Sequence, residues 1–137
     1  MKSLRESLVE LIRRTSAEIP TDVQQAILKA LEAEQQGTIA ESAMRIIQKN
    51  IELAEKKSQP LCQDTGSALF YVDAPRGLDQ GAFEETAREA VRESTRLGYL
   101  RQNSVDSLTG ANDGTNVGPG SPILHFHQHG APEVTVR

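Results

Sequence analysis

Apolar residues recur at helical spacing in four stretches of the 137-residue chain. The first stretch lies before Pro20, the second between Pro20 and Gly37, the third between Ile39 and Ala54, and the fourth after Gly77. Their apolar positions are, in order, Leu4, Leu8, Leu11 and Ile12; Val23, Ile27, Ala30 and Leu31; Ile39, Ala43, Ile46, Ile47, Ile51 and Ala54; and Phe83, Ala87, Ala90 and Val91. The pattern predicts four amphipathic helices separated by proline and glycine.

Three shorter runs have the composition of β-strands. "SALFYVDA" is rich in strand formers and ends at Pro75, whereas "ILHFHQ" and "EVTVR" stand near the end of the chain with "HGAP" between them. Four residues of this kind between two strands predict a hairpin turn. We therefore expect an α+β fold, in which a helical N-terminal half is followed by a small, mainly antiparallel sheet with a long polar loop.

The predicted loop runs from Arg101 to Pro122 and has no usable periodicity. It contains four glycines, two prolines and many short polar side chains. A long irregular segment inside a compact domain is uncommon and is often functional. The loop is not a phosphate-binding loop, because it lacks a Gly-Lys-Ser/Thr ending. It also lacks the alternating acidic ligands of a calcium loop.

Composition narrows the class of protein. The chain carries 37% hydrophobic residues and a net charge of −4, with no basic or aromatic-interleaved stripe, which argues against a nucleic-acid partner. No stretch approaches the ~20 apolar residues that cross a bilayer, and one cysteine cannot form an internal disulfide. We expect one domain over residues 1–137, in the cytoplasm and without a membrane partner. Because the sequence stops at Arg137 inside a strand-like run, we also expect a truncated part of a larger assembly.

Cys62 is the only cysteine, and it stands in the polar turn "PLCQDTG". A lone cysteine is commonly a small buried hydrophobe, but these polar neighbours suit a thiolate that binds a metal or attacks an electrophile. A nucleophile would need a histidine base, which the sequence does not place beside it. A cluster or zinc site would need further ligands from outside the 137 residues.

Other candidates have ordinary interpretations too. Asp64 suits a turn or a helix cap. Arg101 suits either a solvated surface position or a bidentate hydrogen-bonded contact with a carboxylate. His125, His127 and His129 alternate, so they share one face of a strand. No matching thiolate or carboxylate accompanies them, which favours an exposed strand face with Phe126 turned toward the core.

"PLCQDTG" and, some forty residues later, "LRQNSVDSLTGANDGTN" together resemble the N-terminal (alpha) part of the iron–sulfur hydro-lyases, the family of class I fumarate hydratase and L-tartrate dehydratase. The resemblance covers roughly Ile39 to the C-terminus. It implies a [4Fe–4S] cluster held by three cysteines, with Cys62 as the first ligand. Gln63, Asp64 and Arg101 match residues that reach a hydroxy-diacid substrate, Asp64 being the candidate catalytic residue. The two other cluster cysteines, a following glycine-rich segment and the C-terminal (beta) part, which supplies the base, are absent from the sequence.

The resemblance implies dehydration of a 2-hydroxy dicarboxylic acid, malate to fumarate or tartrate to oxaloacetate, in an enzyme of which this chain alone is inactive. A homodimer is expected from the family's habit and from a free strand edge. Two alternatives remain open: a non-catalytic dimerisation or partner-binding module derived from the same fold, and a thiol enzyme that uses Cys62 without metal.

Overall fold

The computed structural model describes residues 2–137 and contains four helices and three strands. In chain order these are α1 (Leu4–Ala17), α2 (Thr21–Ala33), α3 (Ile39–Lys57), β1 (Leu69–Pro75), α4 (Gln80–Arg96), β2 (Ile123–His129) and β3 (Thr135–Val136). All four predicted helices are present, and the predicted α+β class is confirmed. None of these helices combines the length and apolar content needed to cross a bilayer.

Local sequence explains where the helices begin. Ser3 and Glu6 form a reciprocal capping box at the start of α1, because each side chain accepts a hydrogen bond from the other residue's backbone N–H, at 3.2 and 2.7 Å. Asp79 caps α4 by accepting from the Ala82 N–H at 3.0 Å. These caps fix the two helices that enclose the core.

The sheet differs from the predicted one in strand direction. β1 lies between the other two strands and pairs in parallel with β2 along its whole length, from Leu69 opposite Ile123 to Pro75 opposite His129. β3 pairs antiparallel with β1 through only two residue pairs. The sheet is therefore mixed, and the prediction of a mainly antiparallel sheet was wrong. The reason is the long connection through α4 and the polar loop, which returns the chain to the same end of the sheet as a βαβ crossover does.

The predicted hairpin at "HGAP" was also wrong. Those residues connect β2 to β3, but the two strands lie on opposite sides of β1 and do not pair with each other. The Tyr71 N–H donates to the Arg137 carbonyl at 2.8 Å, and the Arg137 N–H donates to the Tyr71 carbonyl at 2.9 Å. Arg137 thus extends the antiparallel contact one residue past β3.

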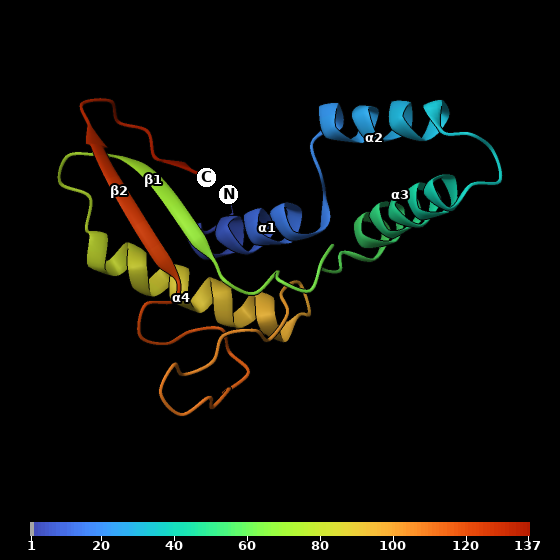
Figure 1. The fold of residues 1–137 in the computed structure, drawn as a ribbon. Helices are drawn as coiled ribbons and strands as arrows, with labels where there is room; N and C mark the ends of the chain where they lie inside the picture. Colours follow the sequence, from blue (N-terminus) through green and yellow to red (C-terminus); the bar gives the residue numbers. More distant parts are fainter. Residues whose placement is uncertain (1) are drawn as a thin grey trace.

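The hydrophobic core lies between the sheet, α1 and α4 (Figure 1). The apolar face predicted for α4 is confirmed, since all four of its residues are buried. The buried members of the cluster are Leu8, Ile12, Phe70, Val72, Ala74, Phe83, Ala87, Ala90, Val91 and Leu100. In contrast, α2 and α3 extend away from this core as a pair, and α2 contains no buried residue (Figure 1).

Candidate functional site

The turn that carries Cys62 is anchored at its entry by two helices. The Leu61 N–H donates to the Ser16 carbonyl at the end of α1, at 2.9 Å. The Asn50 side chain of α3 donates to the Leu61 carbonyl, also at 2.9 Å. The backbone just before Cys62 is therefore held by α1 and α3, whereas the cysteine side chain is exposed and not disulfide-bonded.

The Cys62 side chain lies beside the Thr65 hydroxyl. Its sulfur lies 3.2 Å from the Thr65 hydroxyl, which also donates to the Cys62 carbonyl at 3.0 Å. Gln63 and Asp64 are exposed on the same turn. The predicted alternative of a buried hydrophobic cysteine is thus wrong, because the sulfur is exposed beside a hydroxyl at the surface.

The two motifs, far apart in sequence, contact each other directly. The Arg101 N–H donates to the Thr65 carbonyl at 2.6 Å, and the Asn103 side-chain amide donates to the Gln63 carbonyl. We call this contact, between residues 62–66 and the segment 101–122, the motif junction. It brings the backbones of three predicted site residues, Gln63, Asp64 and Arg101, into one place.

Gly66 is required for the close approach at the motif junction. A Cβ on Gly66 would lie 2.6 Å from the Arg101 carbonyl oxygen and 2.8 Å from the Asn103 Cβ. Such distances are closer than packed atoms tolerate, so only glycine lets the two segments meet here.

Asn116 organises the junction, and the sequence did not single it out. Its side chain is fully buried, at 0% exposure. The Oδ1 atom accepts from the N–H groups of Asn103 and Ser104, at 3.0 and 3.1 Å. Its Nδ2 donates to the Arg101 carbonyl at 2.6 Å and to the Thr95 hydroxyl at 3.1 Å. One amide therefore fixes the backbone from the Arg101 carbonyl to the Ser104 N–H and ties it to Thr95 of α4.

The residue type at position 116 is a weak sequence signal for a turn. The backbone of Asn116 is left-handed, with φ at 58°, and asparagine tolerates that conformation better than most residues. Asn116 also closes the second motif. These two signs mark a turn, but they do not reveal that the side chain is buried.

Two aspartates stabilise tight turns within the segment 101–122. Hydrogen bonds from the Thr109 N–H and hydroxyl, and then from the Leu108 N–H, hold the pKa of Asp106 below its ordinary value. The Thr115 N–H and hydroxyl lower the pKa of Asp113 in the same way. The Arg88 side chain of α4 donates to the carbonyls of Gly118 and Ser121, at 3.3 and 3.2 Å. The irregular segment predicted from composition is therefore an ordered loop attached to α4.

The three histidines lie on β2. The His125 ring stacks on Tyr71, with the centroids 5.1 Å apart, and the His127 Nδ1 lies 3.3 Å from an Asp73 carboxylate oxygen. Phe126 points the other way and meets Phe83 edge to face, which confirms its predicted direction. Within residues 2–137 no three His, Cys, Asp or Glu side chains gather as a metal site.

Comparison with known proteins agrees with the two motifs. A sequence model of the family described as fumarate hydratase (Fumerase) matches residues 5–137. The chain is 44% identical over 128 residues to "Putative fumarate hydratase class I" of Geobacillus stearothermophilus, a match that covers 93% of the chain and 25% of the relative.

Two alpha subunits are also similar. "Putative L(+)-tartrate dehydratase subunit alpha" of Methanocaldococcus jannaschii is 31% identical, over 90% of the chain and 44% of the relative. "L(+)-tartrate dehydratase subunit alpha" of Escherichia coli K12 is 28% identical, over 89% of the chain and 40% of the relative. The chain thus spans between a quarter and less than half of the length of these relatives. The extent of the family match shows that the chain belongs to the fumarate hydratase (Fumerase) family.

Proposed function

We propose that the chain is one part of a [4Fe–4S]-dependent hydro-lyase that reversibly dehydrates a 2-hydroxy dicarboxylic acid, either malate to fumarate or tartrate to oxaloacetate. The observation that supports this most directly is the motif junction. The Arg101 backbone N–H bonds to the turn that carries Cys62, so the backbones that present the sulfur and the guanidinium are joined. Such a substrate requires both a metal ligand and a carboxylate-binding group.

Cys62 fits the cluster as a single ligand. Its thiol is free, exposed and held on an anchored turn, 3.2 Å from the hydroxyl of Thr65, which donates to the Cys62 carbonyl. One thiolate does not hold a cluster, so the other ligands belong to sequence outside this chain, as does the C-terminal (beta) part. When bound, a cluster with one open iron supplies a Lewis acid for the substrate hydroxyl.

The remaining residues bind and orient the substrate. The Arg101 guanidinium offers two parallel N–H donors to one substrate carboxylate, a geometry that lysine does not reproduce. Gln63 and Asp64, exposed beside Cys62, hydrogen-bond the hydroxyl or the carboxylate next to it. Because Asn116 binds the Arg101 carbonyl and the N–H groups of the residues that follow, the Arg101 side chain starts from a fixed backbone.

A chimeric enzyme tests this proposal. We would replace the matched region of the Geobacillus stearothermophilus relative with this chain, purify the protein anaerobically, and reconstitute it with iron and sulfide. We expect cluster absorption in the visible range and hydration of fumarate. Cys62→Ser should remove both signals. Arg101→Lys should keep the absorption but lower kcat/KM for the dicarboxylate by about 10²-fold, because an oriented charged contact is lost.

Arg96→Lys is the matched control for the arginine. Arg96 is exposed and pairs with Glu93 at 2.7 Å at the end of α4, so its replacement should leave turnover unchanged. A Cys62→Ser chimera that retains the cluster and full turnover would refute the assigned role of Cys62.

Experiments on the 137-residue chain by itself distinguish the hydro-lyase hypothesis from the two alternatives. After the same reconstitution, we expect the 137-residue chain to bind no stoichiometric cluster and to turn over neither fumarate nor tartrate. A metal-independent thiol enzyme would instead react through Cys62 without iron, and a thiol-reactivity assay with Cys62→Ser detects that activity. A chimera that folds but neither binds the cluster nor turns over, together with partner binding by the chain, would favour the interaction module.

A further inference from the structure

The outer side of β2 is the long free edge of the sheet. Within residues 2–137, β2 pairs with β1 alone, and it is seven residues long, whereas the strand at the opposite edge, β3, has two. The register with β1 runs without a bulge from Ile123 to His129. β2 contains no lysine and no proline, two residues that commonly protect an edge strand. An unprotected edge of this length is a template for another strand.

Alternate residues of β2 direct their backbone groups to this free edge. The Ile123 N–H donates to the Ala68 carbonyl at 3.0 Å, and the His129 carbonyl accepts from the Arg76 N–H at 3.2 Å. The odd-numbered residues of β2 therefore bond to β1. Because the side to which N–H and C=O point alternates along a strand, the even-numbered residues present theirs to the free edge. These residues are Leu124, Phe126 and Gln128.

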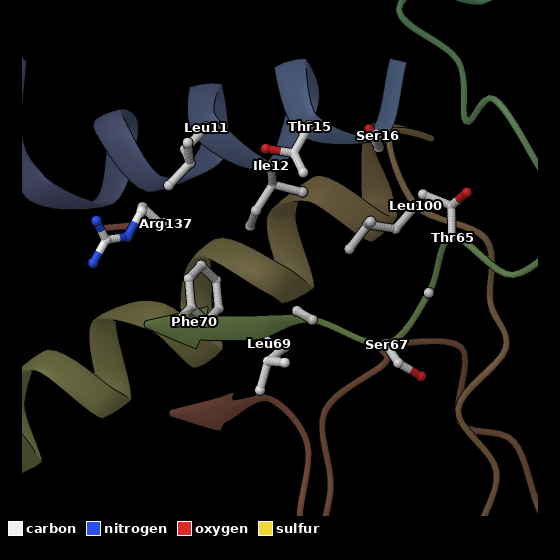
Figure 2. A pocket seen from close by; sticks show the side chains of 12 residues that line it. Leu11, Ile12, Thr15, Ser16, Thr65, Ser67, Leu69, Phe70, Leu100 and Arg137 are labelled. Atoms are coloured by element: carbon white, nitrogen blue, oxygen red, sulfur yellow. The ribbon is translucent and has the colours of Figure 1, made fainter. Parts of the chain in front are cut away.

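The hydrophobic core is open beside the same edge. Phe70 of β1 turns toward α1 and Leu69 turns away from it (Figure 2). The parallel register places Leu124 beside Phe70, and Phe126 beside Val72, on the core face. Leu124 and Phe126 are nevertheless partly exposed, whereas their β1 neighbours are only 3% and 1% exposed. A strand added beside β2 would continue the core face and cover these two side chains.

We propose that β2 is a dimer interface, at which two copies of the chain pair antiparallel through their β2 strands about a two-fold axis at Phe126. In this register Phe126 forms a hydrogen-bonded pair with Phe126 of the second copy, and Leu124 forms one with Gln128 of the second copy. All the outward backbone groups of β2 are then paired. Moving the axis one residue earlier would set Gln128 opposite Pro122, which has no N–H to donate.

Two features favour a second copy as the occupant of this edge. The register is self-complementary, because each copy offers the other the edge that it needs. β2 also contains no Asp, Glu, Lys or Arg, so two identical strands meet without like-charge repulsion, and the pairing brings two phenylalanine rings together on the core face. Strand, direction and register are thus specified for the homodimer that the sequence predicts, and none of them depends on the hydro-lyase chemistry.

Disulfide trapping tests the register. In a Cys62→Ser background, one chain would carry His125→Cys and another His127→Cys, both at exposed positions. The proposed pairing sets residue 125 of one copy opposite residue 127 of the other, with Cα atoms about 4.5 Å apart, which a disulfide spans. Within a dimer of either variant alone, the two cysteines lie on a diagonal about 7–8 Å apart, which is too far.

We expect the oxidised equimolar mixture to give about fivefold more disulfide-linked dimer than either variant alone, because only the mixed dimer has bridging geometry. An equal yield from a single variant, or no linked dimer in the mixture, would overturn the proposal.

Reversible association gives a second test that needs no added cysteine. An interface built on one strand pair belongs to the weak class, so sedimentation would follow the chain from about 10 μM to about 1 mM. Gln128→Pro removes an N–H that faces the free edge and leaves the bonds to β1 intact. By symmetry a bond is lost at both ends of the pairing, so Kd should rise about tenfold or more.

Gln128→Thr is the matched control, because threonine keeps the N–H and suits a strand, and Kd should change by less than about twofold. Circular dichroism of both variants checks that the fold is kept. A chain that stays monomeric at the highest concentration, or a folded Gln128→Pro variant that dimerises as tightly as the original chain, would overturn the proposal.

Discussion

The apolar body of the molecule and the motif junction are held together by different interactions. The body, formed by the sheet, α1 and α4, buries apolar side chains against one another. The junction leaves most of its side chains exposed and fixes its backbone through one buried amide, Asn116, and one close glycine contact, Gly66. A scaffold built this way keeps its functional side chains free for a ligand while their backbone stays fixed.

The largest expected effect breaks the body. Phe83→Ala removes a buried ring that packs on Phe126, with centroids 5.8 Å apart, and should lower the free energy of unfolding by about 3–5 kcal/mol. Leu108→Ala in the junction is the matched control, because Leu108 is 95% exposed and its loss should cost less than about 0.5 kcal/mol. Urea denaturation measures both values. Similar values for the two variants would contradict the division between body and junction.

The next effect breaks the junction from within. Asn116→Ala removes the side-chain acceptor of the Asn103 and Ser104 N–H groups and the side-chain donor to the Arg101 carbonyl, so of these contacts only the 3.0 Å bond from the Asn103 N–H to the Arg101 carbonyl is left. It also places alanine at a left-handed φ. We expect a loss of about 2–4 kcal/mol in the free energy of unfolding.

Asn116→Gly separates the two causes, because glycine accepts the left-handed backbone and restores about 1 kcal/mol of that loss. Asn112→Ala is the control at an exposed position in the same loop and should cost less than about 1 kcal/mol. A loss for Asn116→Ala no larger than for Asn112→Ala would show that the buried amide does not organise the junction.

A smaller effect concerns the contact between the motifs. Gly66→Ala forces a methyl group against the Arg101 carbonyl and the Asn103 side chain, and should cost about 1–3 kcal/mol. Gly81→Ala in α4 provides the opposite sign: its new Cβ approaches nothing closer than 3.5 Å, and alanine in a helix should stabilise by about 0.5–1 kcal/mol. Unfolding of both variants in urea checks the sign, and a neutral Gly66→Ala would mean that the motifs separate easily.

The body was more predictable from sequence than the junction. The apolar spacing of α4, from Phe83 to Val91, locates a buried helix face because only one face of an amphipathic helix can meet the core. Strand direction was not predictable in this way, because the residue pattern of "ILHFHQ" is equally compatible with parallel and with antiparallel pairing. Local turn chemistry favoured a hairpin at "HGAP", but β1 occupies the central place between β2 and β3.

The candidate site was predictable only as two motifs. Their contact depends on the hydrogen bond between the Arg101 N–H and the Thr65 carbonyl, which no periodicity encodes. Gly66 closes the first motif, yet its partner across the junction lies far away in sequence. The role of Asn116 depends on the burial of its side chain. An asparagine in a glycine-rich stretch indicates a turn rather than a buried side chain with several hydrogen bonds.

The smallest expected effect is a difference between the two regions in how their stability depends on pH. The hydrogen bonds from Thr109 lower the pKa of Asp106 below its ordinary 3.8, and those from Thr115 do the same for Asp113. In the body, the Arg96 side chain lowers the pKa of Glu93 below its ordinary 4.5. Because each folded pKa is depressed, the unfolded chain binds protons first, and the contribution to stability is present above the ordinary pKa and lost as pH falls through the folded one.

Asp106→Asn keeps the Oδ1 acceptor but removes the charge, so it imitates the protonated loop. Its Tm should lie slightly below that of the original chain at about pH 6, and the difference should vanish only after the pH falls below 3.8, where the Asp106 carboxylate of the original chain is protonated as well. Glu93→Gln should begin to lose its difference at a higher pH, because the ordinary pKa of Glu93 is 4.5. Thermal unfolding between about pH 6 and pH 2.5 compares the two variants. If the Asp106→Asn difference persisted unchanged at the lowest pH, the carboxylate charge would not be what stabilises the turn, and the acid response would belong to the body alone.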